Sequence, residues 1–280
     1  MIPEGGQAQP GLPLLLFLLF LRRFGPGDGV VVAPVFRVVL QHAQPLEHPP
    51  VGAVPDLGPV SYTHLVQLMV MKCDKFKGKG FDAFLMSQMW DCREDRERIF
   101  KECQYQVAAT DMLAAALPAL ERADLDAGFV EALAELYPTC EAFYFQNCGK
   151  LLLAEDVRSH QIQGPDRFIR FGVNVRFFNI QGTEDMLIDT VGMSTLFLPD
   201  LQYHFRGMDP NWVVNHAYNL ASYILDNDDP IKDGETVDGV AGGEMSREVQ
   251  WKCRYEDALV QPPRAVLDIH MGEFASGRRG

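Results

Sequence analysis

Imidazole and carboxylate groups offer the clearest chemistry in this sequence. His204, His216 and His270 lie in its last third, and Asp200 stands shortly before His204. Together these groups suit zinc or iron, and a metal-bound water would then act as the nucleophile of a hydrolase. The H-E-x-x-H spacing of a local zinc site does not occur in the sequence. A metal-dependent hydrolase therefore requires these four residues to meet in the fold, and we assign no metal and no cofactor from the sequence itself.

A second hypothesis places binding rather than catalysis on the same stretch of chain. The run LQYHFR alternates apolar and polar residues, which predicts a strand with one polar face. We expect this face and its neighbours to form a polar patch that binds a protein or a small ligand. The patch consists of Asp200, Gln202, His204, Arg206 and His216.

Three other motifs lack the spacing that their chemistry requires. Ser194 does not stand in the G-x-S-x-G elbow of a serine hydrolase. The glycines and lysines of residues 72–80 lack the G-x-x-x-x-G-K-S/T spacing that surrounds a phosphate. The acidic run 226–238 lacks the glycine and the twelfth-position glutamate of an EF-hand loop. We interpret both runs as solvated turns.

The six cysteines show no metal or redox pattern. No C-x-x-C pair occurs among them, so zinc-finger and thioredoxin-type sites are excluded by spacing. Cys253 falls on the apolar side of a predicted strand, and we expect it to be a small buried hydrophobe. Because the sequence shows no secretion signal, we expect no disulfides.

Composition and charge narrow the class of protein. The chain has 280 residues, of which 47% are hydrophobic, enough for a core in one large domain or two small ones. It carries 38 acidic against 25 basic residues, a formal charge of −13. This charge disfavours nucleic acid and anionic membrane surfaces as partners, and it does not specify an oligomeric state.

The first 65 residues differ from the rest. Residues 1–58 hold nine of the 18 prolines and eight of the 24 glycines, but no lysine and no cysteine. The apolar run 12–21 is too short to cross a bilayer, and its charged flanks have the wrong order for a signal peptide. Residues 59–65, PVSYTHL, resemble the translation of a sequencing-adaptor remnant. We therefore expect residues 1–65 to be disordered or artefactual, with the natural sequence resuming near Val66.

The remaining chain predicts an α+β fold. Apolar and alternating runs predict strands, including one hairpin, over 65–71, 105–109, 141–154, 168–177, 186–198, 201–205, 249–255 and 265–270. Helical spacing predicts helices over 91–102, 121–137 and 209–226. Adjacent strands outnumber regular strand–helix alternation, which favours a mostly antiparallel or mixed sheet with helices packed on one face. We divide the chain into residues 1–65, 66–180 and 181–280.

Several short motifs in the last third carry a family resemblance. They are Gly192-Met193, Leu198-Pro199-Asp200, His204-Phe205, Asp233-Gly234-Glu235-Thr236 and Pro263-Arg264. With their surroundings they resemble the bacterial family called domain of unknown function 4261. The family has no established reaction, so the resemblance implies a bacterial, cytoplasmic protein and assigns no residue roles.

Our leading prediction is a non-catalytic cytoplasmic bacterial protein that binds another protein or a small ligand through the polar patch. Its acidity would suit, for example, a basic partner protein, because complementary charge speeds association. The alternatives are the metal-dependent hydrolase and a structural module of a larger assembly.

Overall fold

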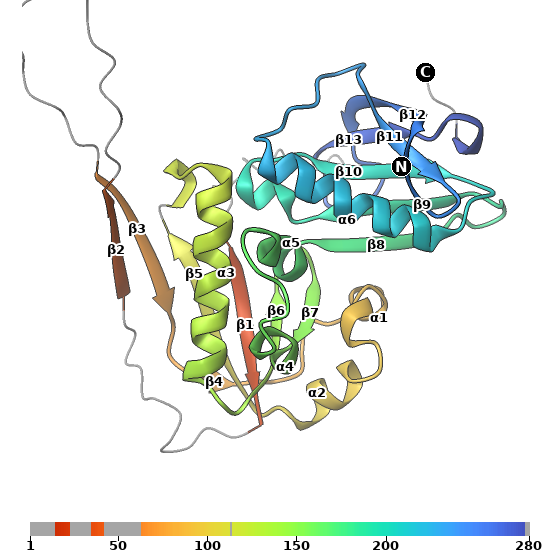
Figure 1. The fold of residues 1–280 in the computed structure, drawn as a ribbon. Helices are drawn as coiled ribbons and strands as arrows, with labels where there is room; N and C mark the ends of the chain where they lie inside the picture. The colour runs from red at the N-terminus through yellow and green to blue at the C-terminus, as the bar shows by residue number, and fades with distance from the viewer. Residues whose placement is uncertain (1–14, 23–34, 42–62, 113, 278–280) are drawn as a thin grey trace, which may run out of the picture.

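The first half of the chain forms a seven-stranded antiparallel sheet (Figure 1). The computed structural model describes residues 15–22, 35–41, 63–112 and 114–277. The strands lie in the order β2-β3-β5-β1-β6-β7, and β4 pairs with β5 where β3 no longer does. Their bounds are β1 (Leu16–Leu21), β2 (Val35–Gln41), β3 (Thr63–Val70), β4 (Asp74–Lys75), β5 (Tyr105–Met112), β6 (Cys140–Phe145) and β7 (Lys150–Leu153).

Strand β1 lies at the centre of this sheet, although the sequence predicts a disordered lead there. Phe17 and Leu19 are fully buried, and the strand pairs with β5 on one side and with β6 on the other. An apolar run of this length suits a strand that is largely covered. The structure thus places residues 16–21 in the sheet, where the sequence predicts a disordered or artefactual lead. The adaptor-like residues 59–62 lie outside the described part of the chain.

The second half forms a six-stranded mixed sheet in the order β11-β12-β13-β10-β9-β8. Strands β10 and β13 run parallel, and the other neighbours run antiparallel. Their bounds are β8 (Asn174–Asn179), β9 (Met186–Val191), β10 (Asp200–Phe205), β11 (Thr236–Ala241), β12 (Glu244–Asp257) and β13 (Ala265–His270). This sheet begins at Asn174, before the predicted boundary at residue 181.

Helices and sheets together confirm the α+β class. The α-helices are α1 (Ala83–Ser87), α2 (Arg96–Glu102), α3 (Ala119–Leu136), α4 (Ala154–Arg158), α5 (Asp166–Gly172) and α6 (Pro210–Asp226). Short 3-10 turns are η1 (Trp90–Cys92), η2 (Ala114–Ala116), η3 (Met193–Leu196) and η4 (Gly272–Phe274). None of the described helices is both long enough and apolar enough to cross a bilayer.

The helices are not confined to one face of the first sheet. Helices α3 to α5 cover one face, and α6 covers one face of the second sheet (Figure 1). Ile99 of α2 instead packs in a separate cluster with Phe20 and Tyr144, whose side chains point to the opposite face of the first sheet. The predicted one-sided arrangement therefore holds for α3 to α5 and α6 but not for α2.

Helix α6 begins where the sequence predicts. The Asp209 side chain accepts a hydrogen bond from the backbone N–H of Asn211, and Pro210 occupies the first helical position. Both features are local, because an N-cap and a proline at the first turn need no tertiary contact to start a helix.

The strand predicted over 168–177 is wrong in its first part. Residues 166–172 form α5, and β8 starts only at Asn174. Phe168, Ile169 and Phe171 are buried in that helix. These three residues fit one face of a helical turn, whereas Ile169, Phe171 and Val173 alternate as in a strand, so the hydrophobic pattern alone does not decide between the two.

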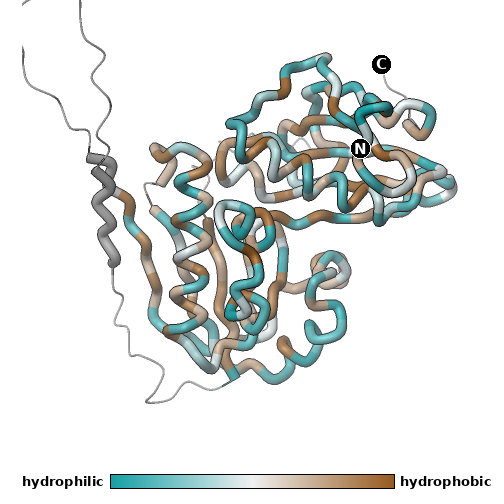
Figure 2. Tube along the Cα trace, in the orientation of Figure 1, coloured by the Kyte–Doolittle hydropathy of each residue, from teal (hydrophilic) through white to brown (hydrophobic). Residues whose placement is uncertain are grey.

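One hydrophobic core runs through both halves of the chain. The strands carry most of the hydrophobic colour in Figure 2, whereas the connecting loops are mostly hydrophilic. Arg122 of α3 adds a polar link between the halves. Its Nε donates to Asp111 Oδ2 of β5 at 3.0 Å, and its Nη1 donates to the backbone oxygen of Thr195 in η3.

Candidate functional site

The five residues of the predicted polar patch do not form one exposed surface. Asp200, Gln202 and His204 share one face of β10, but Asp200 and Gln202 are fully buried. Arg206 is exposed just beyond the end of the strand. His216 lies in α6 and packs against the opposite face of the sheet.

Asp200 belongs to a buried network of ion pairs. Arg264 donates from Nε to Asp200 Oδ2 at 3.2 Å and from Nη2 to Asp189 Oδ2 at 2.8 Å. Arg176 Nε donates to the other oxygen of Asp189, also at 2.8 Å. The backbone N–H of Met193 donates to Asp200 Oδ1 at 3.1 Å. Burial raises the pKa of Asp200 to about 6, while the Arg264 guanidinium acts in the opposite direction.

Gly192 allows the chain to place that backbone N–H. Its φ is 134°, and a Cβ at this position would stand 2.1 Å from the backbone oxygen of Gly172. No other residue fits such an approach without movement of the backbone. The glycine of the Gly192-Met193 motif thus has a packing role beside the Asp200 network.

Gln202 is occupied by contacts with later parts of the chain. Its Nε2 donates to Asp268 Oδ1 of β13 at 3.1 Å, and its Oε1 accepts from the backbone N–H of Leu259 at 2.8 Å. The segment after β12 therefore covers a strand face that the alternating sequence predicts to be exposed.

His204 is also enclosed. Its Nε2 lies 3.6 Å from Asp185 Oδ2. Gly277 passes so close that a Cβ there would stand 2.4 Å from the imidazole ring. The described end of the chain therefore limits access to this ring from solvent.

His216 is a buried packing residue. Its Nδ1 lies 2.9 Å from Tyr203 Oη, and its Nε2 lies 2.7 Å from the backbone oxygen of Asp238. A carbonyl oxygen can only accept, so Nε2 carries the proton and Nδ1 accepts from the tyrosine hydroxyl. Burial lowers the pKa of His216, which keeps the ring neutral.

The predicted metal ligands are divided between two faces of the second sheet. Asp200 and His204 lie on one face and His216 packs on the other, so they do not surround a common point. His270 is exposed at the end of β13. Within the described ranges, no three His, Cys, Asp or Glu side chains are grouped to hold a metal ion. Cys253 is fully buried, as predicted for a core thiol.

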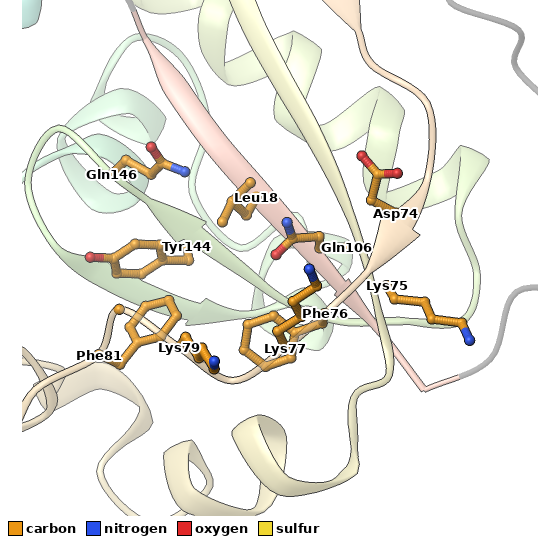
Figure 3. Close-up of a pocket in the computed structure, with 11 residues that line it drawn as sticks. Leu18, Asp74, Lys75, Phe76, Lys77, Lys79, Phe81, Gln106, Tyr144 and Gln146 are labelled. Atoms are coloured by element: carbon orange, nitrogen blue, oxygen red, sulfur yellow. The ribbon is translucent and has the colours of Figure 1, made fainter.

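A cavity of about 940 Å³ opens instead on the face of the first sheet opposite α3 (Figure 3). Its floor consists of Leu18 of β1, Gln106 of β5 and Tyr144 of β6, with Gln146 at one end. Its wall comes from the segment 74–81, which we call the lysine strap. Figure 3 shows Tyr144 and Phe81 together at one end of the cavity and Lys75 at the other.

The start of the lysine strap is fixed by the sheet. Strand β4 pairs with β5, and the backbone N–H of Phe76 then donates to the backbone oxygen of Gln104 at 2.8 Å. The Phe76 ring lies 4.7 Å from that of Phe20, centroid to centroid. Residues 77–80 are exposed. The strap thus combines a fixed aromatic base with accessible lysines.

Positive charge gathers at this cavity. Lys75, Lys77 and Lys79 line it, and a second cavity of about 430 Å³ shares Lys75, Phe76 and Lys77 and adds Lys101. Four of the chain's eight lysines therefore border two adjoining cavities, in a chain with a formal charge of −13. In a chain with this net charge, the four lysines form a local cationic site for an anion.

The sequence interpretation of residues 72–80 as a solvated turn is correct about exposure but misses the cavity. Lysines at every second position, 75, 77 and 79, with Phe76 and Phe81 nearby, were the available signal. That signal does not locate a cavity, because the floor comes from three strands that are distant in the sequence.

The comparisons with known proteins concern the second sheet. Residues 189–270 match the family model described as a domain of unknown function, DUF4261. The match confirms the resemblance predicted for the C-terminal part of the chain. Neither a curated protein nor a solved structure gives a match. The matched range contains α6 and β10 to β13. It begins well after the lysine strap, which therefore lies outside it.

Proposed function

We propose that this chain, whose C-terminal part matches a family without an assigned activity, is a non-catalytic binding protein for a small anionic ligand. The ligand lies in the cavity beside the lysine strap. The observation that carries the proposal is the gathering of Lys75, Lys77, Lys79 and Lys101 around two adjoining cavities of a chain with a formal charge of −13.

The shape of the site favours a small ligand over a partner protein. A volume of about 940 Å³ falls in the range of about 300–1,000 Å³ that is typical of small-molecule sites. The lining is more polar than that of a typical small-molecule site, because three lysines, an aspartate and two glutamines stand beside three aromatic rings and a leucine, and this composition suits a charged ligand. The metal-dependent hydrolase receives no comparable support, because its predicted ligands are divided between two faces of a sheet.

We also propose a bacterial origin and a cytoplasmic location. The resemblance to a bacterial family supports the first. Free thiols support the second, because five of the six cysteines are buried as thiols and reduced cysteines are typical of the cytoplasm.

Inorganic tripolyphosphate is a suitable first probe, because it offers negative charge without any other recognition feature. We expect titration calorimetry of the full chain to show one binding event in low salt that weakens as sodium chloride is raised. The K77A/K79A double variant changes only exposed side chains and should lower the affinity at least tenfold.

The matched control is K232A, which removes an exposed lysine of the second half of the chain. It should bind tripolyphosphate like the wild type. If the control and the double variant lose affinity equally, or if the wild type does not bind at low salt, the proposed function is wrong.

A further inference from the structure

We infer that the ligand of this cavity is a nucleoside polyphosphate, in which a planar heteroaromatic ring is joined to a chain of phosphates. This inference rests on the proposed function and deepens it. It depends on two neighbouring features of the cavity: an aromatic and amide end, and a run of lysines that continues into the second cavity.

One end of the cavity suits a planar ring. The Phe81 and Tyr144 rings meet edge to face with their centroids 4.9 Å apart, and both border the cavity. Tyr144 is buried, so the half-buried Phe81 is the ring that a base would contact. Aromatic side chains stack with any nucleobase, because every base has a π-face. Figure 3 shows Gln146 beside Tyr144, at the same end.

Two glutamine side chains supply polar recognition of that ring. Gln106 stands on the floor and Gln146 at the end of the cavity. A primary amide both donates and accepts hydrogen bonds, so it matches the mixed donor and acceptor edge of a nucleobase. An inorganic polyphosphate can accept a hydrogen bond from the amide N–H groups, but when deprotonated it has no donor for the amide oxygen, so it matches only half of each amide.

The lysines are spread along the cavity instead of gathered at one point (Figure 3). Lys75 and Lys79 are separated by four residues, which corresponds to a span of at most about 14 Å in extended chain. A chain of phosphates can contact several of these lysines at once. Lys101 in the adjoining cavity extends the cationic surface past Phe76.

The acidic residue of the lining forms its ion pair with a lysine outside the lining. Asp74 borders the cavity, but its Oδ1 lies 3.7 Å from Nζ of Lys72, a lysine that is absent from the lining of both cavities. The lysines of the lining are thus available to phosphate oxygens.

The test compares three probes on the full chain by titration calorimetry in low salt without divalent cations: ATP, inorganic tripolyphosphate and adenosine. We expect ATP to bind at least tenfold more tightly than tripolyphosphate, and adenosine to bind more weakly than either. AMP should bind more weakly than ATP, because it leaves most of the lysines without a phosphate.

Variants then separate the two ends of the ligand. Q106A/Q146A should lower the affinity for ATP towards that for tripolyphosphate and leave tripolyphosphate binding unchanged. K101A should lower the affinity for ATP more than the affinity for AMP. The matched control Q163A, an exposed glutamine elsewhere, should change neither affinity.

The possible failures are distinguishable. Equal affinities of the wild type for ATP and tripolyphosphate would overturn the nucleotide inference and leave the anionic site standing. Tight binding of an acidic peptide such as oligoglutamate, with no preference for ATP, would overturn it in favour of a protein ligand. ATP binding that K77A/K79A does not weaken would place the nucleotide elsewhere and overturn both proposals.

Discussion

Tyr203 and His216 are joined by a 2.9 Å hydrogen bond that connects strand β10 to helix α6. The bond places the imidazole on the side of the sheet away from Asp200 and fixes its tautomer, since Nε2 is engaged by a backbone oxygen. His216 therefore acts in packing, and its titration affects folding rather than a reaction.

We expect His216 to make the fold less stable as the pH falls. Burial lowers its folded-state pKa below the ordinary 6.5, so the unfolded chain takes up the proton first. The stability linked to this group is present above about pH 6.5 and is lost as the pH falls below that value. Urea unfolding between pH 7.5 and 5 should show a flatter dependence for H216Q than for the wild type, whatever the absolute stability of the variant. Parallel curves would contradict this role.

Asp126 of α3 is predicted to destabilise the fold at high pH. Both of its carboxylate oxygens are buried without a hydrogen-bond partner among the described residues, and Oδ2 lies 3.7 Å from Arg122 Nε. Burial, followed by the nearby Asp111 carboxylate, raises the pKa of Asp126. The unfolded carboxyl therefore ionises first, and stability is lost as the pH rises.

The variant D126N removes this titration. At pH 8 it should unfold with a free energy about 1–3 kcal/mol above that of the wild type, because the amide does not ionise in the unfolded chain and each unit of pKa difference corresponds to about 1.4 kcal/mol. The difference should shrink towards pH 5. The exposed E135Q on the same helix is the control and should stay within about 0.5 kcal/mol at both pH values. A gain for D126N that does not vary with pH would rule out ionisation as its cause.

Phe197 is predicted to store backbone strain. The backbone φ of Phe197 is 61°, a left-handed conformation that costs a non-glycine residue about 1–2 kcal/mol. Because the residue is 59% exposed, burial of its side chain offsets little of this cost. F197G should therefore raise the free energy of unfolding by up to about 1 kcal/mol after the larger entropy of glycine in the unfolded chain is included. F197A keeps the Cβ and should show no gain. Thermal melts of the two variants and the wild type measure this difference. An equal gain in stability for F197G and F197A would exclude backbone strain as the cause.

Strand β1 is predicted to be essential for folding. A chain shortened to begin at Val66 lacks the strand between β5 and β6 and should show no cooperative melt. In the full chain, F17A should lower the free energy of unfolding by about 3–5 kcal/mol, because the Phe17 ring is fully buried. L18A should lower it by less, because Leu18 is only half-buried. A shortened chain that melts cooperatively would show that residues 1–65 are dispensable, in support of an artefactual lead.

The sequence predicts features that depend on neighbouring residues. The start of α6 is one, because Asp209 and Pro210 act within a single turn. Strand β10 and the inward direction of the Tyr203 side chain are two more such features, because the alternation of apolar and polar residues predicts both.

What covers the other face of β10 depends on residues that are distant in the sequence. Gln202 is buried by contacts with Leu259 and Asp268, which no local pattern connects to it. The same reason explains the missed cavity, whose wall and floor come from separate segments. The misplaced strand at 168–177 has another cause, because a short apolar run fits two periodicities.

The central position of β1 also has a consequence for the order of events during synthesis. Leu16 pairs with Thr110 and Phe17 with Phe145, so this strand is made first and its partners follow much later. At about 5–20 residues per second, the interval between β1 and the end of β6 lasts about 6–25 s. Until β5 is made the apolar strand has no native neighbour, and until β6 is made it has only one. Its pairing then requires contacts between distant parts of the chain, which are slow to form. We therefore expect newly made chains to depend on chaperones until β6 has left the ribosome.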